Sequence, residues 1–435
     1  MRRIAVLACL LLGLGAGTAD AAIVARTFDD AALALAPGGS PRIAYAAGGA
    51  LFLASPRRDG SFAAARIGRL PAGRPRLAGV EVDARGRAFV LVEDEAGRWL
   101  LLADRVRSRW RLRSVPGRLP SGAVLGAAGL ELDRVGRPSV GYAYRLPDRK
   151  TFLRLAGGGD FRTIPITREG FPESATVPAS APVRMPDGKM RVLETYSARG
   201  GGAILWRHTG SDWRGLFLSS SVGGTSPVGP AFARADGDRF AAAWTLAGPV
   251  PGELQARLAT RLGPQSDTLH HRALVEALTF APDGPELAAT EPVGDLAAGL
   301  ILSPARTVEV DGRPLGLEAA ADGARHLLLA GADGLAWYRS PGPVVTSVSL
   351  AAASTPPDGA VALTGGVAGA TGGTVEVYRE PGPGRRELAG TAMVAPDGSF
   401  SLVDRASTSP LRYRAVYRDP LSGIPYASLL RRPVS

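Results

Sequence analysis

The chain has 435 residues, of which 45% are hydrophobic, and it carries a formal net charge of +11 at pH 7. This length exceeds what one hydrophobic core usually serves, and the only cysteine, Cys9, excludes a disulfide scaffold and a cysteine-based metal site. The positive charge is nearly all arginine and is interspersed with acidic residues, which disfavours a nucleic-acid partner.

The N-terminal residues have the pattern of a secretory signal peptide. Arg2 and Arg3 precede an apolar run at 4–16, and the small-residue triplet Ala-Asp-Ala ends at Ala21. We therefore predict a signal peptide at 1–21 and an exported protein, either secreted or on the outer surface of a bacterium. Cys9 lies in a stretch that resembles a lipobox, but most of the apolar run follows it. No later segment has the roughly 18 apolar residues that a membrane span needs.

A short turn signal recurs along the chain, and each copy is followed by a β-prone stretch. Examples are APGGSPRIAY, DARGRAFVLV and PDGKMRVLETY. The turns are anchored by seven glycines spaced 39 to 52 residues apart, namely Gly39, Gly86, Gly136, Gly188, Gly237, Gly284 and Gly323. A period of about 48 residues is typical of an array of repeated structural units.

Each unit contains four short runs of residues that alternate between apolar and polar or are rich in β-branched side chains. Each run is bounded by Gly, Asp or Pro. Four strands per unit predict an all-β fold, a seven-bladed β-propeller over residues 22–341, with six or eight blades as alternatives. The last unit lacks a fourth strand, whereas AAIVARTF at 21–28 precedes the first anchor without partners. We therefore expect this N-terminal stretch to supply the missing outer strand and close the ring.

The segment ADRVRSRWRLRS (103–114) places arginine at five alternate positions, which would share one face of a single extended strand. Another interpretation is favoured when this unit is aligned with the other units on the aromatic residue that begins each fourth strand. Arg105, Arg107 and Arg109 then lie at the tip between strands three and four, and only Arg111 and Arg113 lie on a strand. Charge on an outermost strand discourages edge-to-edge pairing, so we favour a structural role over an anion site.

These hairpins resemble the place where propellers of the sialidase type carry their Asp box, Ser/Thr-x-Asp-x-Gly-x-Thr-Trp/Phe. SPRRDGSF (55–62) keeps the first Ser and the last Phe, but Arg57 stands where the box has Asp. WRHTGSDW (206–213) keeps Gly and Trp, but His208 stands at that position. The box is a structural device and no copy keeps its Asp, so the resemblance implies architecture and does not imply activity.

A sialidase-like activity would need, by the same resemblance, a tyrosine nucleophile activated by a glutamate, an acid/base aspartate and three arginines. The best local candidate is LETY, where Glu194 and Tyr196 lie two apart on a strand and so share a face. Tyr196 aligns with Tyr144 of the third unit, eight residues after each anchor glycine, which favours a repeated packing position. We take Glu194, Tyr196 and Tyr144 as candidate binding residues and assign no catalytic residue.

The four histidines do not form a metal site by spacing: His208, His270, His271 and His326 have no partner at the separation that a helix or hairpin requires. No phosphate-cradling loop, EF-hand or nucleophile elbow occurs in a convincing context. We therefore expect no metal and no cofactor.

The 48-residue rhythm stops after RSPGP (339–343), and residues 342–435 form a second domain with seven short β-prone runs. That count suits a β-sandwich. The order ALTGGV, TVEVYRE, TAMVAPDGSFSL and RYRAVYRD resembles the Ig-like or fibronectin-like modules of exported bacterial proteins. The resemblance implies a fold and is nearly silent on function.

These observations predict an exported, non-catalytic binding or scaffolding protein that acts as a monomer. It would use a propeller face to engage a carbohydrate or an extracellular protein. The alternative is an exo-glycosidase resembling sialidases, with a pocket near the ring axis. A lyase or phosphate-ester activity has no motif in its favour.

Overall fold

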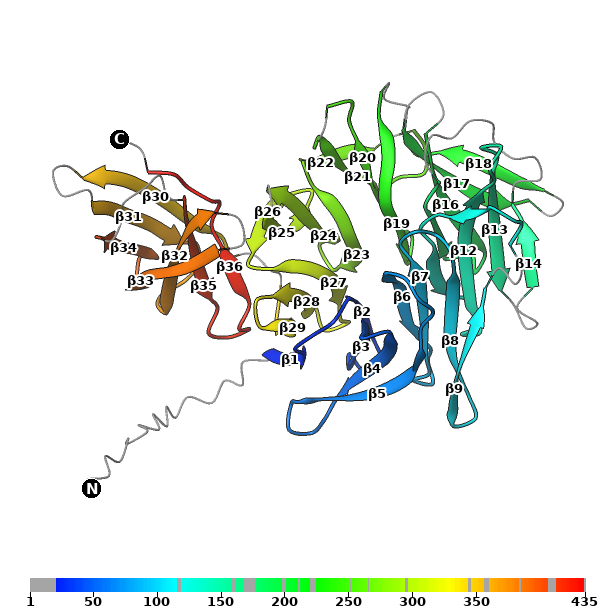
Figure 1. The fold of residues 1–435 in the computed structure, drawn as a ribbon, viewed down its shortest axis with the longest axis horizontal. Coiled ribbons are helices and arrows are strands. Elements are labelled where there is room, and N and C mark those ends of the chain that lie inside the picture. The colour runs from blue at the N-terminus through cyan, green and yellow to red at the C-terminus, as the bar shows by residue number, and fades with distance from the viewer. Residues whose placement is uncertain are drawn as a thin grey trace.

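The computed structural model of the chain describes residues 21–115, 119–157, 162–166, 177–197, 201–209, 212–219, 224–250, 252–264, 266–293, 296–342, 346–355, 360–382, 385–405 and 412–433. Every regular element in these ranges is a strand (Figure 1), which confirms the all-β fold class. The same ranges contain no helix long and apolar enough to cross a membrane. The predicted signal peptide lies outside them except for Ala21, which begins the first strand.

Seven antiparallel sheets follow one another along the described chain, and each contains a run of at least three consecutive strands. The first three contain β2 (Asp30–Leu35), β3 (Pro41–Ala47), β4 (Ala50–Pro56) and β5 (Phe62–Arg69); β6 (Pro75–Val82), β7 (Ala88–Asp94), β8 (Leu100–Val106) and β9 (Arg109–Ser114); and β10 (Val124–Leu125), β11 (Gly129–Leu132), β12 (Pro138–Arg145), β13 (Thr151–Gly157) and β14 (Arg162–Pro165). The next two contain β15 (Ser180–Arg184), β16 (Met190–Tyr196), β17 (Gly202–His208) and β18 (Trp213–Phe217); and β19 (Ser226–Asp236), β20 (Arg239–Ala247), β21 (Leu254–Ala259) and β22 (Asp267–His271).

The sixth sheet begins with β23 (Leu274–Ala281), β24 (Gly284–Val293), β25 (Leu296–Ser303) and β26 (Arg306–Val310). The seventh contains β27 (Arg313–Ala319), β28 (Arg325–Gly331) and β29 (Gly334–Ser340). Its fourth strand is β1 (Ala21–Ala25), which pairs antiparallel with β29, so the two ends of this region share one sheet.

The hairpins between the first and second strands explain the period of the sequence. All seven anchor glycines lie in or beside these hairpins, with φ between +54° and +140°. Glycine is favoured there because side chains rarely tolerate such a backbone. In the second sheet the preceding Asp83 accepts the N–H groups of Arg85 and Arg87 at 2.9 and 2.8 Å, which fixes the turn.

The first strands of the seven sheets, which are β2, β6, β15, β19, β23 and β27 together with β11 of the third sheet, contact one another in order. The strand β27 also contacts β2, so the series returns to its start. Hydrophobic cores fill the spaces between neighbouring sheets. The core that joins the seventh sheet to the first contains Leu33, Ile43, Leu315 and Leu328, each at most 8% exposed. The seven first strands therefore surround a common axis (Figure 1).

The arginine-rich segment folds as a hairpin. Arg107 and Ser108 form the turn between β8 and β9, with φ of +58° at Arg107. Arg111 donates two hydrogen bonds to Asp104 across the hairpin, at 3.0 and 2.6 Å. The five guanidinium groups therefore do not lie on one continuous strand. The predicted tip position is confirmed for Arg107, but it is wrong for Arg105 and Arg109, which lie on β8 and β9.

The C-terminal region forms two further layers. A three-stranded sheet contains β30 (Val348–Thr355), β31 (Ala360–Val367) and β34 (Ser399–Asp404). The facing strands are β32 (Thr374–Gly382), β33 (Arg385–Met393), β35 (Arg412–Arg418) and β36 (Pro425–Ala427). They continue the sixth sheet, because Val310 at the end of β26 pairs with Tyr426. Arg386 also donates to both carboxylate oxygens of Asp311, at 2.8 and 2.9 Å.

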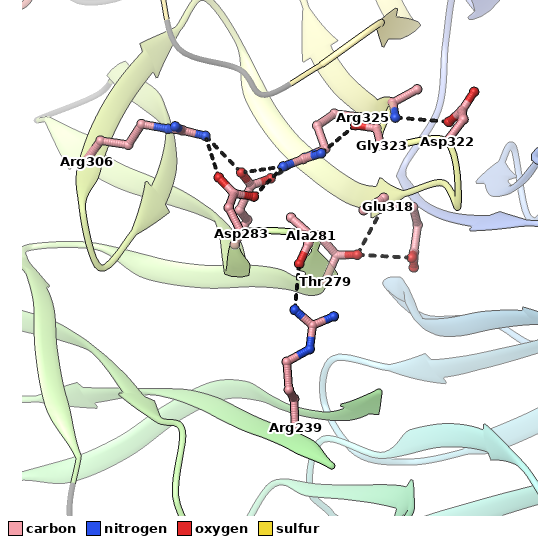
Figure 2. Close-up of polar contacts among 12 residues, drawn as sticks. Arg239, Thr279, Ala281, Asp283, Arg306, Glu318, Asp322, Gly323 and Arg325 are labelled. Atoms are coloured by element: carbon pink, nitrogen blue, oxygen red, sulfur yellow. Dashed lines mark hydrogen bonds and ion pairs between the residues drawn. The ribbon is translucent and has the colours of Figure 1, made fainter. Parts of the chain in front are cut away.

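An ion-pair network centred on a buried arginine–glutamate pair joins the sixth and seventh sheets (Figure 2). Arg325 on β28 has a 1% exposed side chain and donates to Glu286 on β24 at 2.8 and 3.2 Å. It also donates to Asp283 at 2.9 Å and to the carbonyl of Gly323 at 2.5 Å. Arg306 donates to the same Glu286 at 3.0 Å. Since a buried charge is costly unless it is paired, this network holds the two sheets in one relative position.

Candidate functional site

A cavity of about 380 Å³ lies on the axis that the first strands surround, and all seven of these strands contribute to its wall. One group of interacting charged side chains lies near the first residues of β2, β6, β23 and β27. A second, separate group of charged side chains lies near the last residues of β6, β11 and β27. The first strands therefore run in the same direction along the axis. The cavity has a start end and a far end.

The start end is lined by Glu95 and by five further charged residues that we call the mouth cluster: Asp30, Arg76, Glu93, Glu276 and Arg313. Arg313 donates to both carboxylate oxygens of Glu276, at 2.9 and 3.1 Å. Arg76 donates through two nitrogens to one oxygen of Glu93, at 2.7 and 2.5 Å. Asp30 Oδ2 accepts the backbone N–H of Leu77 at 2.7 Å. Each guanidinium thus has its own carboxylate, and Asp30 lies beside these pairs.

Burial raises the pKa of Asp30 to about 6, and the charge of Glu276 adds to this effect. The N–H of Leu77 and the positive charge of Arg313 act in the opposite direction. Burial also raises the pKa of Glu93, against the charge of Arg76. A carboxyl group with a pKa near 6 exchanges its proton close to neutral pH, so Asp30 can either accept or donate a hydrogen bond there.

The mouth cluster occupies one side of the ring. Four of its members come from β23, β27, β2 and β6, which are consecutive around the axis, and Glu93 comes from β7 beside β6. Near the start end the other three first strands present small or apolar residues to the cavity, among them Gly129, Ala181, Pro182 and Gly229, whereas β19 presents Arg234 further along the axis. The start end of the cavity therefore has one polar wall and one apolar wall, a combination typical of small-molecule sites.

The far end is crossed by what we call the Arg234 cluster, made of Arg234, Glu81, Glu131 and Glu318. Arg234 on β19 donates to Glu81 on β6 at 2.7 Å and to Glu318 on β27 at 3.2 Å, and lies 4.0 Å from Glu131 on β11. Burial raises the pKa of Glu131 and of Glu318 to about 7. The neighbours of β19 in the ring are β15 and β23, so these contacts span the axis and obstruct the far end.

The predicted Glu194 and Tyr196 lie on β16, away from the residues that line this cavity. Glu194 is 1% exposed and accepts a hydrogen bond from Trp206 Nε1 at 2.7 Å. Burial raises its pKa to about 7. Tyr196 packs edge-to-face on Phe217 with ring centroids 5.8 Å apart.

Tyr144 occupies the equivalent place on β12. It stacks on Phe152 at 5.2 Å, and its hydroxyl accepts a hydrogen bond from Arg154 at 3.2 Å. The structure does not bring Tyr144 into the axial cavity either. A binding role for Glu194, Tyr196 and Tyr144 stays a prediction.

The sequence contained a weak signal for the mouth cluster. Asp30, Arg76, Glu276 and Arg313 lie eight to ten residues before the anchor glycine of their units. Alignment on the anchors would have placed four charges at one level of the first strands. In the remaining three units the corresponding residues carry no charge, so the repeat gave no reason to single out this position.

Metal ligands do not gather in the described ranges: no group of three or more His, Cys, Asp or Glu residues there could hold an ion. His208 packs on Trp213 at 5.3 Å, and the buried His326 lies 5.5 Å from Trp337.

The chain matches no known protein-family model and no curated protein. Solved structures of similar shape include an ulvan lyase from a new polysaccharide lyase family (10% identity, TM-score 0.39, covering 59% of this chain and 75% of that one). A Hadza microbial sialidase has 12% identity and a TM-score of 0.40, covering 71% and 74%. A lectin of Aleuria aurantia, solved with Fucα1-6GlcNAc, has 12% identity and a TM-score of 0.42, covering 64% and 94%. At these scores and identities the likeness assigns no function to this chain.

Proposed function

We propose that this protein is an exported bacterial carbohydrate-binding protein whose ligand sits in the axial cavity against the mouth cluster. In this proposal the seven sheets are the blades of a β-propeller closed by β1, and residues 342–435 are an Ig-like β-sandwich. The ring of first-strand contacts and the shared sheet of β1 and β29 support the propeller assignment.

The observation that carries the proposal is the pairing of charges at the start end. Arg76 and Arg313 each already face a carboxylate, so an anionic ligand would have to displace Glu93 or Glu276. A neutral sugar has hydroxyl groups that both donate and accept, and it can bond to paired carboxylates and guanidinium groups without separating them. The apolar wall suits the C–H face of a sugar ring.

Substitution of Asp30 by asparagine tests the proposal. Loss of charge-assisted hydrogen bonds should lower sugar affinity about 10- to 100-fold. Calorimetry on residues 22–435, with a panel of neutral mono- and oligosaccharides, measures this. Tyr196→Phe is the matched control at the sequence-predicted site, and its affinity should equal that of the unchanged protein. If Tyr196→Phe lost binding and Asp30→Asn kept it, the ligand site would lie on β16.

The pH dependence of binding follows from the same residue. Ionised Asp30 accepts stronger hydrogen bonds than the neutral acid, so affinity should rise severalfold from pH 5 to pH 7, across its pKa of about 6. Asp30→Asn should remove this rise. If the affinity of Asp30→Asn still rose between pH 5 and pH 7, the pH dependence would belong to another titratable group.

Hydrolysis of a glycosidic bond is the second candidate, and the pKa of Asp30 favours it. Asp30 would donate its proton to the leaving oxygen as the C–O bond breaks. Glu276 would accept a proton from the water whose hydroxide adds to the anomeric carbon. Fluorogenic aryl glycosides, sialosides included, test this. Turnover that is lost in Asp30→Asn and retained in Tyr196→Phe would establish the enzyme, and absence of turnover would leave the binding function.

A further inference from the structure

A second hollow, which we call the side groove, lies at the start end between the first and second sheets. Its volume is about 530 Å³. It is lined by the segment before β2, the β3–β4 turn, the β5–β6 loop, the first residue of β6 and the residue after β7. Phe28, Pro71, Arg74 and Glu95 are among its lining residues.

The side groove adjoins the axial cavity at Glu95. Glu95 lines both, and Asp29 and Arg74 of the groove are close in sequence to Asp30 and Arg76 of the mouth cluster. Arg74 lies 3.6 Å from Glu95, and their exposed fractions are 88% and 50%. A ligand that fills the cavity can therefore extend sideways into the groove.

The β5–β6 loop that borders the groove is held in place. The buried Asp94 accepts the N–H of Arg74 at 3.1 Å and two hydrogen bonds from Arg98, at 2.5 and 2.9 Å. Gly73 has φ of +152°, and a Cβ there would come within 2.3 Å of Asp94 Oδ1. The groove is thus a formed surface.

The chemistry of the groove resembles that of the cavity. Phe28 and Pro71 supply apolar surface, and Arg74 and Glu95 supply polar groups beside it. A Cβ added at Gly48 or Gly49 would meet no atom within 4 Å, so this edge is open. Such a mixture suits further sugar units.

The axial cavity has no exit for a polymer at its far end, because the Arg234 cluster spans that end. A chain cannot thread through the ring. Only a chain end can enter from the mouth cluster, and the remainder of the ligand has to leave through the side groove.

We propose that the ligand is a neutral oligosaccharide bound by its chain end, with the terminal unit in the axial cavity and the next one or two units in the side groove. This inference rests on the proposed carbohydrate-binding function. It adds that recognition is specific for chain ends and that Arg74 contacts the second unit.

Affinity as a function of chain length tests the inference. The probes are gluco-, manno-, galacto- and xylo-oligosaccharides of one to five units, measured by calorimetry on residues 22–435. In the series that binds, affinity should rise at least tenfold from one unit to three and then level off. Equal affinity for one and three units would refute the side groove while leaving the binding function in place. Absence of binding in every series would refute the binding function itself.

Arg74→Ala should remove most of the gain between one and three units and leave monosaccharide affinity unchanged. Arg85→Ala is the matched control, because Arg85 is also an exposed arginine but lies in the β6–β7 turn at the opposite end of the strand. An equal loss for monosaccharide and trisaccharide in Arg74→Ala would place Arg74 outside a second-unit site.

Binding to the corresponding polysaccharide distinguishes chain ends from internal units. Partial cleavage of the polymer multiplies its ends without changing its mass. The amount of protein bound per gram should then rise with the number of ends. A capacity that stayed constant or fell would show that internal units are recognised.

Discussion

Arg325→Ala is expected to lower the free energy of unfolding by about 3–5 kcal/mol, the largest loss that we expect from one side chain. The variant leaves Glu286, which is 2% exposed, with Arg306 as its remaining cationic partner, and it removes the donors to Asp283 and Gly323. Denaturant unfolding followed by tryptophan fluorescence measures the change, because the seventh sheet contains Trp337.

Two comparisons separate the buried charge from a general effect of losing an arginine. Arg339→Ala removes the exposed pair with Asp322, whose side chains are 35% and 59% exposed, and should cost at most about 1 kcal/mol. Combining Arg325→Met with Glu286→Gln removes both buried charges together and should recover much of the loss. A loss for Arg325→Ala no greater than that for Arg339→Ala would contradict the structural role of the network.

Glu194→Gln is expected to stabilise the protein above neutral pH, by on the order of 3 kcal/mol at pH 8. Burial raises the pKa of Glu194 to about 7, above its value in the unfolded chain. The stabilising contribution of a raised carboxyl is fully present below its unfolded pKa and is lost as pH rises through the folded pKa. The free energy of unfolding of the unchanged protein should therefore fall between about pH 5 and pH 8.

The difference between variant and unchanged protein isolates Glu194, because Glu131, Glu309 and Glu318 also have a pKa raised to about 7 by burial. At pH 5 the two proteins should be almost equally stable, since glutamine replaces a neutral acid of the same shape and can still accept from Trp206. Glu387→Gln on the exposed part of β33 should change stability little at either pH. A constant difference across the pH range would show that Glu194 is not the titrating group.

The hairpins of the repeat could be predicted from the sequence because their cause is local. Every unit has a glycine with positive φ at this hairpin, and in several units, as at Asp83 and Gly86, a preceding aspartate accepts backbone N–H groups. The turn at Arg107 was also predictable, through the aromatic residue that begins each fourth strand, although Arg107 itself adopts a positive φ without being glycine.

The mouth cluster could not be predicted from the sequence in the same way, because its cause is not local. Arg76 and Glu276 are 200 residues apart in the chain, and they approach only when the first strands meet around the axis. Local spacing instead singled out Glu194 and Tyr196. Strand alternation places these two side chains on one face, but alternation cannot tell whether that face meets a cavity or packs on Trp206 and Phe217.

The pairing of β1 with β29 has a consequence for how the protein is made. Tyr338 is synthesised about 300 residues after Ala21, its partner in the shared sheet, which corresponds to roughly 15–60 s of translation. Throughout that interval β1 has no partner, and its apolar residue Ile23 is available to other strands and to chaperones. The last sheet can form only when both ends of the region are present, so a truncated or stalled chain lacks the step that completes the ring.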